Sequence, residues 1–249
     1  MPKHAYHGQL SVVVPVRNEQ DNIEPLVREI VSALTGVADF ELVYVDDGST
    51  DATRARLDAL KAQVPQLRVI RHRTACGQSR ALCTGVRAAR YAWIATLDGD
   101  GQNDPLELPR LLAVLADPAH SPRLELIAGW RAQRRDSTLR CLSSRVANAV
   151  RTRVLKDHTA DSACGIKLFA RETFLQLPDF DHMHRFLPAL VKRQGGEVVS
   201  IPVSHRARLR GRSHYGIHNR LWTGLIDLAG VLWLQRRIKL PVIEPGSDL

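Results

Sequence analysis

Two aspartates separated by a single glycine carry the clearest chemical signal in the sequence. Asp98, Gly99 and Asp100 follow an apolar run typical of a buried strand, and Gln102 comes two residues later. Carboxylates at this spacing can converge on one hard cation, with the amide oxygen of Gln102 as a further ligand, and such a cation is normally shared with phosphate oxygens. We therefore predict a Mg²⁺ or Mn²⁺ site formed by Asp98, Asp100 and Gln102.

This acidic turn does not fit a calcium-binding EF-hand loop. Asn103 stands where that loop needs glycine, and Pro109 stands where it needs a bidentate glutamate. A purely structural interpretation stays open, because aspartates also cap turns that lead into helices.

Polar clusters also follow two earlier apolar runs, at Pro15 to Glu19 and at Asp46 to Ser49. A carboxylate in the second cluster can accept hydrogen bonds from ribose hydroxyls or from the edge of a base, although each cluster alone is also explained as a helix cap or an ordinary turn. Three strands that end in polar groups indicate one shared polar edge, which chance turn chemistry rarely produces.

The elements that must position these residues alternate regularly in the first half of the chain. Helical patterns separate five apolar strand patterns, at residues 10–15, 40–45, 67–70, 91–97 and 124–128. This alternation predicts an α/β fold, with a mostly parallel sheet and helices on both faces. In such sheets, ligands bind beyond the carboxyl ends of the strands.

The second half is less regular and more basic. We expect a basic helix over residues 138–154, a helix over 186–192, a strand over 197–203 and a helix around Trp222 to Trp233. This last helix has an apolar side and a basic end, which are typical of an amphipathic helix lying on a membrane surface. Packing on its own domain, or in a dimer, is the alternative. The predicted organisation is a catalytic domain (1–215), this helix (216–240) and a flexible tail (241–249).

Several classes of protein are excluded. A NAD-binding Rossmann protein is disfavoured because no GxGxxG pattern follows the first predicted strand, and a P-loop protein because the P-loop pattern is missing. The GxSxG elbow of the α/β-hydrolases is missing too. Its longest apolar stretch, residues 221–234, contains Asp227 and is shorter than the about 20 residues that a spanning helix needs. The start lacks a signal peptide, and the four cysteines lack metal-binding spacing, so we expect a cytoplasmic protein with free thiols.

The ordered set of motifs resembles the family 2 nucleotide-sugar glycosyltransferases of the GT-A (Rossmann-like) fold. Within that family it is most similar to dolichyl- and polyprenyl-phosphate mannosyltransferases and their bacterial relatives. The resemblance spans residues 10–235 and rests on the three polar clusters together with Gln102, Ile127–Arg131, Ser144, Arg145, Asn148, Asp161–Phe169, Ile201–Val203 and Arg208–Ser213.

The resemblance implies roles for individual residues. Those matching the nucleotide-sugar site are Pro15, Arg17, Glu19, Val45, Asp47, Asp98, Gly99, Asp100, Arg131, Arg208 and His214, of which Asp100, Arg131 and Arg208 would be catalytic. Those expected to bind the acceptor phosphate are Arg140, Arg145, Lys167 and Ser213, and the stretch from His184 to Pro188 would border the acceptor side.

The implied reaction is metal-dependent transfer of a hexose, most simply mannose from GDP-mannose, to dolichyl or undecaprenyl phosphate. We expect inversion by direct displacement, because no residue suggests itself as a nucleophile for a two-step route. UDP-glucose or a UDP-amino-sugar is the alternative donor. A nucleic-acid-binding module is the alternative of a different class. It is disfavoured because the sequence lacks an RNP-like aromatic pattern and an unmetallated acidic pair repels phosphate.

The net charge of +9 supports a lipid-phosphate partner. Residues 123–156 hold nine basic and two acidic groups, and residues 204–249 hold eight and three, while the first half is slightly acidic. Each Lys or Arg near an anionic leaflet contributes about 1 kcal/mol. We therefore expect peripheral binding at the cytoplasmic face of the membrane, with a separate spanning partner as one way to supply the lipid-facing part.

Overall fold

The computed structural model describes residues 6–132, 151–207 and 218–239, with the side chains of the last segment from Thr223 onward. The strands are β1 (Gln9–Val16), β2 (Asp39–Asp46), β3 (Leu67–Arg71), β4 (Trp93–Thr96), β5 (Leu124–Arg131), β6 (Lys167–Ala170) and β7 (Glu197–Val203). The helices are α1 (Gln20–Leu34), α2 (Thr53–Lys61), α3 (Gln78–Ala88), α4 (Glu107–Ala116), α6 (Arg171–Leu175), α7 (Leu187–Arg193) and α8 (His218–Arg236), with a 3₁₀ turn η1 (Met183–Arg185).

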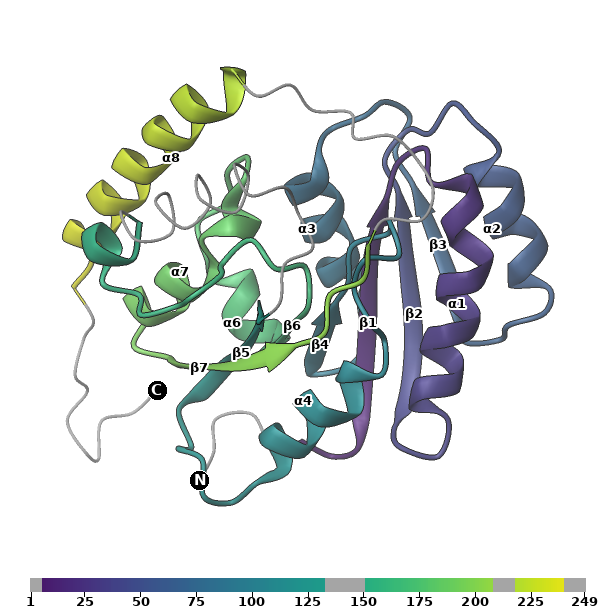
Figure 1. Ribbon diagram of the computed structural model, residues 1–249, viewed down its shortest axis with the longest axis horizontal. Helices are drawn as coiled ribbons and strands as arrows, with labels where there is room; N and C mark the ends of the chain where they lie inside the picture. The colour runs from purple at the N-terminus through teal and green to yellow at the C-terminus, as the bar shows by residue number, and fades with distance from the viewer. Residues whose placement is uncertain (1–5, 133–150, 208–217, 240–249) are drawn as a thin grey trace, which may run out of the picture.

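The strands form one seven-stranded sheet in the order β3-β2-β1-β4-β6-β5-β7 (Figure 1). All neighbouring pairs are parallel except those of β6, which runs antiparallel to both β4 and β5. The carboxyl ends of six strands and the beginning of β6 therefore meet at one edge, which we call the polar edge. This mostly parallel α/β sheet confirms the predicted fold class.

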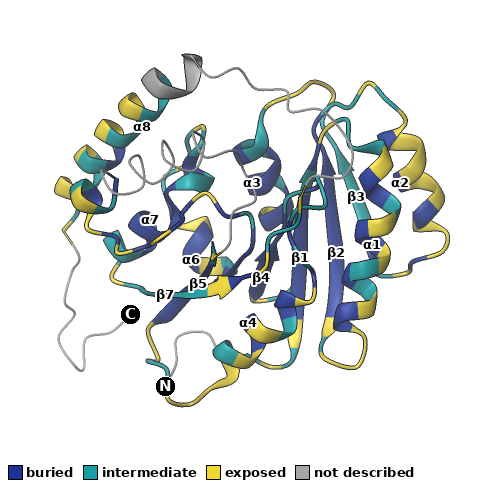
Figure 2. Ribbon diagram, viewed as in Figure 1, coloured by how far each residue is buried: buried dark blue, intermediate teal, exposed yellow. Residues whose placement is uncertain are grey.

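Helices cover both faces of the sheet, which explains why its strands are so apolar. Along β1, Val12 and Val14 pack under α1, α2 and α4, whereas Val13 points to the opposite face and packs under α3. Helices α6 and α7 cover that second face together with α3, and α8 packs on α7 (Figure 1). Figure 2 shows the result: the central strands are buried, α1, α2 and α4 are buried only on their inner sides, and α7 is buried over most of its length.

Among the described strands, β6 is the one that the sequence analysis did not predict, and the short helix α6 that follows it was not predicted either. Strand β6 has four residues, begins with the buried Lys167 and lies inside a segment that had been noted only as a motif. Strand β4 is equally short but is followed by a turn, whereas β6 runs directly into α6 with no turn to mark its end, and its partners β4 and β5 are distant in sequence. The basic helix predicted over residues 138–154 falls mostly outside the described residues, although residues 151–155 are helical.

Helix α8 packs on its own domain instead of standing apart from it. Val231 is fully buried in the core beside α7, and Leu228 and Leu232 pack against the same core (Figure 1). The outward side is also apolar, with Ile226 71% and Trp233 58% exposed. The predicted amphipathic character of this helix is therefore not confirmed. Within the described part of the chain, no helix combines the length and hydropathy needed to cross a bilayer.

Candidate active site

The polar clusters predicted from the sequence meet at the polar edge. The turn after β1 and the turn after β2 are tied together, because the Asn18 amide donates to Ser49 Oγ at 3.0 Å and the Thr50 amide donates to Asn18 Oδ1 at 2.8 Å. The turn after β4, which holds Asp98 and Asp100, lies beside β1 in the sheet. The three turns thus form one surface.

Gly99 allows the acidic turn to approach β1 closely. A Cβ atom at this position would lie 3.0 Å from the Pro15 carbonyl oxygen and 2.5 Å from Val16 Cγ1. Any side chain would therefore push the turn away from the strand. The predicted site residue Gly99 is explained by this close approach, which sets Asp98 and Asp100 beside the end of β1.

Asp98 is half-buried and held from two sides. Its Oδ1 accepts a hydrogen bond from Gln78 Nε2 at 2.8 Å, and its amide donates to Asn103 Oδ1 at 2.8 Å. Burial, and then the negative charge of Asp100, raise the pKa of Asp98 to about 6 against the opposing charges of Lys167 and Arg131.

A hard cation fits this acidic turn. The two carboxylates repel each other, and a divalent ion bound between them would remove that repulsion. Their oxygens are the donor type that Mg²⁺ and Mn²⁺ prefer. Gln102 lies in the same turn, where its amide donates to Asp100 Oδ1 at 3.1 Å and its side-chain Nε2 to the Arg206 carbonyl at 3.4 Å.

A pocket of about 310 Å³ opens beside Asp98. Of the predicted site residues, Pro15, Asp98 and Lys167 line it, together with His184, Arg185 and Leu187 from the stretch expected at the acceptor side. The other lining residues are Gln78, Leu82, Thr96, Leu97, Ala163, Cys164 and Gly165. Gln78 was not anticipated, because it begins α3 and reaches Asp98 only through the fold.

Three basic side chains, those of Lys167, His184 and Arg185, line this pocket. Lys167 is buried and donates to the Cys164 carbonyl, and burial lowers the pKa of its amine. His184 Nδ1 lies 2.7 Å from Ser79 Oγ, and burial together with the charges of Arg185 and Lys167 holds the pKa of His184 well below its usual range. His184 is therefore neutral near pH 7 and offers the pocket an uncharged imidazole.

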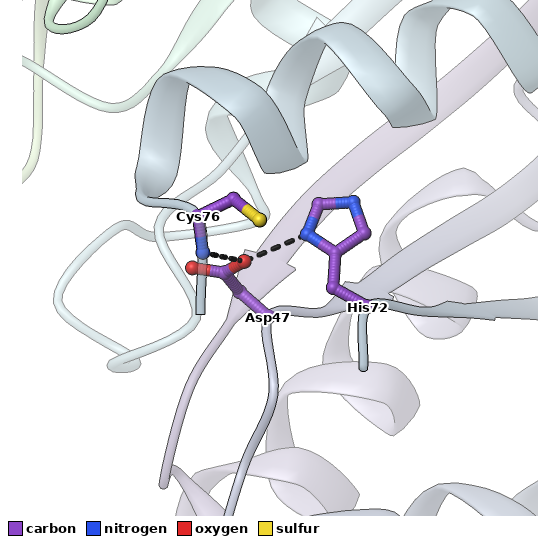
Figure 3. A group of neighbouring side chains, drawn as sticks. All are labelled: Asp47, His72 and Cys76. Carbon is purple, nitrogen blue, oxygen red and sulfur yellow. Dashed lines mark hydrogen bonds and ion pairs between the residues drawn. The ribbon is translucent and has the colours of Figure 1, made fainter. Parts of the chain in front are cut away.

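Asp47 lies at the end of β2 and anchors the segment that leads into α3 (Figure 3). Its Oδ1 accepts from the Cys76 amide at 2.8 Å and contacts His72 Nδ1 at 2.7 Å, and its Oδ2 accepts from the Gly77 amide at 2.7 Å. Gly77 adopts a φ of +94°, which favours glycine. The next residue, Gln78, binds Asp98, so the start of α3 connects the two predicted carboxylates.

Arg131 ends β5 and forms a two-point ion pair with Asp161. Its Nε and Nη2 lie 2.6 and 3.0 Å from the two carboxylate oxygens. Burial disfavours the charge on Arg131, but the hydrogen bond and negative charge of Asp161 outweigh it and raise the pKa of the guanidinium. Arg131 is thus held near Asp98 by a carboxylate to which the sequence assigned no role of its own.

The remaining predicted residues differ in their placement. Arg17 is exposed, whereas Glu19 is half-buried and accepts from Asn22 Nδ2 at 2.7 Å. Val45 is fully buried and packs against α3, so its side chain belongs to the core. The predicted residues that lie outside the described part of the chain are Arg140, Arg145, Arg208, Ser213 and His214.

The pattern of glycosyl transferase family 2 matches residues 11–177. The chain therefore belongs to this family and is a glycosyltransferase, which confirms the identification made from the motifs. Its relatives include the dodecaprenyl-phosphate galacturonate synthase of Rhizobium johnstonii, which is 34% identical over 92% of this chain and 68% of the relative. Another is the undecaprenyl-phosphate 4-deoxy-4-formamido-L-arabinose transferase of Edwardsiella ictaluri, 31% identical over 84% of this chain and 63% of the relative. The chain thus spans about two thirds of the length of these polyprenyl-phosphate sugar transferases.

Solved structures share the fold at lower sequence identity. A mannosyltransferase from Pyrobaculum calidifontis, in complex with GDP-Man and Mn²⁺, superposes with a TM-score of 0.67 at 20% identity, over 97% of this chain and 68% of that one. Glucosyl-3-phosphoglycerate synthase from Mycobacterium tuberculosis, in complex with Mn²⁺, UDP-glucose and glycerol 3-phosphate, gives 0.67 at 20% identity, over 98% and 84%. These likenesses confirm the GT-A fold.

Proposed function

We propose that this glycosyltransferase moves a sugar from a nucleoside diphosphate donor to a polyprenyl phosphate, with Mg²⁺ or Mn²⁺ bound at Asp98 and Asp100. The observation that carries the proposal is the pairing of this acidic turn with a pocket whose polar wall contains Lys167, His184 and Arg185. Such a site offers oxygen ligands for a cation that neutralises a diphosphate, and nitrogen groups for an anionic acceptor. The relatives that act on dodecaprenyl and undecaprenyl phosphate support the same acceptor class.

The residues suit a direct displacement. A polyprenyl phosphate already carries a nucleophilic oxyanion, so the protein needs no strong base. The bound cation supplies stabilisation of the leaving diphosphate. Lys167 and Arg131 lie near Asp98, where their positive charges reduce the repulsion between donor and acceptor phosphates. Inversion at the anomeric carbon follows from such a single step.

Two kinds of donor are compatible with this pocket. GDP-mannose is the donor suggested by the resemblance of the motifs. An acidic or amino-sugar donor is the second candidate, because four nitrogen-bearing side chains line the pocket, those of Gln78, Lys167, His184 and Arg185, and such groups bind a sugar carboxylate or polar substituent. The galacturonate synthase and formamido-arabinose transferase relatives favour this second candidate.

The lipid acceptor places the reaction at a membrane surface. The outward side of α8 exposes Leu225, Ile226 and Trp233 and ends in Arg236 and Arg237. Apolar side chains with an adjacent basic end suit the interface of an anionic leaflet. We infer peripheral binding at the cytoplasmic face, with α8 as the contact.

Donor screening tests the function. Purified protein with Mn²⁺ and undecaprenyl phosphate should release nucleoside diphosphate from one of GDP-mannose, UDP-glucose, UDP-galacturonate or a UDP-amino-sugar, and only when the lipid is present. Asp100→Asn should lower the rate at least about a hundredfold, because it removes a cation ligand. Asp117→Asn is the matched control, since Asp117 is an exposed aspartate of the surface segment after α4. Unaltered turnover by Asp100→Asn, or tighter nucleic-acid binding without transfer, would contradict the proposal.

A further inference from the structure

The chain returns from β7 to the acidic turn. Strand β7 lies at one end of the sheet, and β6 and β5 separate it from β4. Nevertheless, His205, which follows β7, forms an antiparallel bridge with Asn103, which follows β4. The next residue, Arg206, donates its amide to the Gln102 carbonyl at 2.9 Å. Residues 205–206 therefore lie against the turn that contains the predicted cation ligands.

The Arg206 side chain ties this segment to two further elements. Its Nη1 donates to Glu29 Oε2 on α1 at 2.6 Å, and its Nη2 donates to Asp104 Oδ1 at 2.7 Å. Burial disfavours the charge on Arg206, but the hydrogen bonds and negative charges of Glu29 and Asp104 outweigh it and raise the pKa of the guanidinium. One charged side chain thus joins α1, the end of the acidic turn and the segment after β7.

The backbone of Arg206 determines which end of the Gln102 side chain is available. Gln102 Nε2 donates to the Arg206 carbonyl at 3.4 Å, and a carbonyl only accepts, so the NH₂ end of the side chain faces it. The Gln102 oxygen, Oε1, has no hydrogen-bond partner among the residues that the structure describes. The backbone amide of Gln102 donates to Asp100 Oδ1 at 3.1 Å. Gln102 is therefore oriented to offer an oxygen, and it also holds Asp100, a second predicted ligand.

We propose that Arg206 is a positioning residue for the cation site. This inference rests on the proposed function only in that it assigns Mg²⁺ or Mn²⁺ to the acidic turn. The guanidinium cannot bind the ion itself, because it carries donors only. Its pairs with Glu29 and Asp104 hold the Arg206 backbone in place, and that backbone holds Gln102 with Oε1 available for the ion. Groups behind the direct ligands of a metal change its affinity about 10- to 100-fold when they are altered.

Two effects of Arg206 on cation affinity have opposite signs. A positive charge beside the turn repels a bound cation, so loss of the charge alone would strengthen binding. Loss of positioning lets Gln102 turn its oxygen away, which weakens binding. The Arg206 side chain is 36% exposed and already pairs with two carboxylates, so solvent and these partners reduce the effect of its charge. The positioning effect should therefore prevail.

The Mn²⁺ affinity at pH 7.5 tests the proposal without sugar or lipid, and electron paramagnetic resonance of the free ion measures it. Arg206→Ala should bind Mn²⁺ about tenfold more weakly than the unaltered protein. Arg206→Lys should recover part of the affinity, because a lysine keeps the charge but lacks the fork that reaches two carboxylates. Equal or tighter binding of Mn²⁺ by Arg206→Ala would overturn the proposal.

Arg28→Ala is the matched control for the loss of a positive charge. Arg28 lies on α1, next to Glu29, but pairs with Glu24 on the same helix, and both side chains are exposed. This variant should bind Mn²⁺ as the unaltered protein does. A loss as large as that of Arg206→Ala would show that any arginine near α1 has the same effect, and would overturn the specific role of Arg206.

A double-mutant cycle tests whether Arg206 acts through Gln102. Gln102→Ala should itself weaken Mn²⁺ binding, because it removes the oriented oxygen. In that background, Arg206→Ala should have little further effect, since the group that it positions is gone. Fully additive losses would refute the route through Gln102.

Hydrogen exchange provides a readout that needs no metal. In Arg206→Ala, the peptide that contains residues 98–104 should exchange its amide hydrogens faster than in the unaltered protein, while the peptides of β1 and β2 should exchange at unaltered rates. Unaltered exchange in the first peptide, or faster exchange throughout the chain, would overturn a local positioning role.

The transfer assay separates this inference from the proposed function. Arg206→Ala should need about tenfold more Mn²⁺ for half of its maximal rate but should approach the unaltered rate at saturating Mn²⁺, whereas Asp100→Asn should not recover. Absence of transfer by the unaltered protein would refute the proposed function, while the Mn²⁺ affinities and exchange rates would still decide the role of Arg206. Full transfer by Arg206→Ala at an unaltered Mn²⁺ requirement would refute only the role of Arg206.

Discussion

Opposing effects of neighbouring groups at the polar edge determine the pKa of Asp98. Burial and the nearby Asp100 favour its protonated form, while Gln78, Lys167 and Arg131 favour the ionised form. The first two effects prevail, and the pKa lies near 6. A cation must therefore compete with a proton for this oxygen ligand at mildly acidic pH.

Cation affinity should consequently depend on pH in a defined direction. Mn²⁺ binding should weaken about tenfold for each pH unit below about 6 and level off above it, because Asp98 must lose its proton before it binds. In the metal-free protein, the folded state holds this proton more tightly than the unfolded chain does. The contribution of Asp98 to stability therefore falls as the pH rises from about 4 to about 6.

Calorimetric titration with Mn²⁺ between pH 5 and pH 8 measures this dependence. Asp98→Asn should bind Mn²⁺ weakly at every pH and lose the slope. The thermal midpoint of the metal-free protein, compared with that of Asp98→Asn, checks the stability effect. An affinity of the unaltered protein that is flat across this range would show that Asp98 is not the titrating ligand.

The residues of the site divide into those that sequence can reveal and those that only the fold brings in. Asp98 and Asp100 were predictable because both lie in one turn, directly after a recognisable strand. Gln78 and His72 lie on other elements, and nothing in their local sequence indicates that they face Asp98 and Asp47. Val45 was assigned to the nucleotide pocket by resemblance, yet its side chain packs in the core.

Among the elements, β6 places a predicted site residue in a position that the sequence pattern does not predict. Because it runs antiparallel, its first residue, Lys167, lies at the polar edge together with the ends of β1 and β4. A parallel strand would have placed that lysine at the opposite edge. Sequence periodicity predicts the six parallel strands, most of which are long and flanked by turns, but it does not predict the direction of a four-residue strand.

The Arg131–Asp161 ion pair joins the end of β5 to the segment before β6. The Asp161 and Arg131 side chains are only 4% and 17% exposed. Asp161→Ala should therefore lower the free energy of unfolding by about 3 kcal/mol, since it leaves a largely buried guanidinium without its partner. Urea denaturation measures this change.

Arg123→Ala provides the matched control for that prediction. It breaks the Arg123–Glu197 pair, whose side chains are 71% and 39% exposed, and should cost less than about 1 kcal/mol. Equal losses in the two variants would show that the Arg131–Asp161 pair contributes no more than a surface ion pair.

At the scale of the whole molecule, α8 turns one apolar side to the core and another to solvent. Val231 is fully buried on the inner side, while Ile226 and Trp233 are among the most exposed apolar residues that the structure describes. The Arg237 guanidinium lies 5.9 Å from the Trp233 ring, which places a positive charge beside the exposed indole. This outward surface is the one that we propose to contact a lipid leaflet.

Vesicle flotation tests that orientation. Ile226→Asp combined with Trp233→Asp should reduce binding to phosphatidylglycerol vesicles about tenfold or more, because two apolar side chains no longer enter the interface. Higher salt should weaken binding as well, through Arg236 and Arg237. Val37→Asp, a change at an exposed apolar residue between α1 and β2, should leave flotation unaltered. Undiminished flotation of the double variant would assign membrane contact to another surface.

The reversed direction of β6 also brings the two ends of the connection between β5 and β6, residues 132–160, to the same edge of the sheet. Strand β5 ends at the polar edge and β6 begins there, with Arg131 and Asp161 joined at the two ends of the connection. The chain therefore leaves the sheet at Arg131 and enters it again at the same edge with β6. The strand pairings of β5 and β6 lie outside residues 132–160, so an exchange of this segment between relatives would leave the residues that form those pairings unaltered. Chimaeras that exchange residues 132–160 could thus separate what determines the acceptor from what determines the donor.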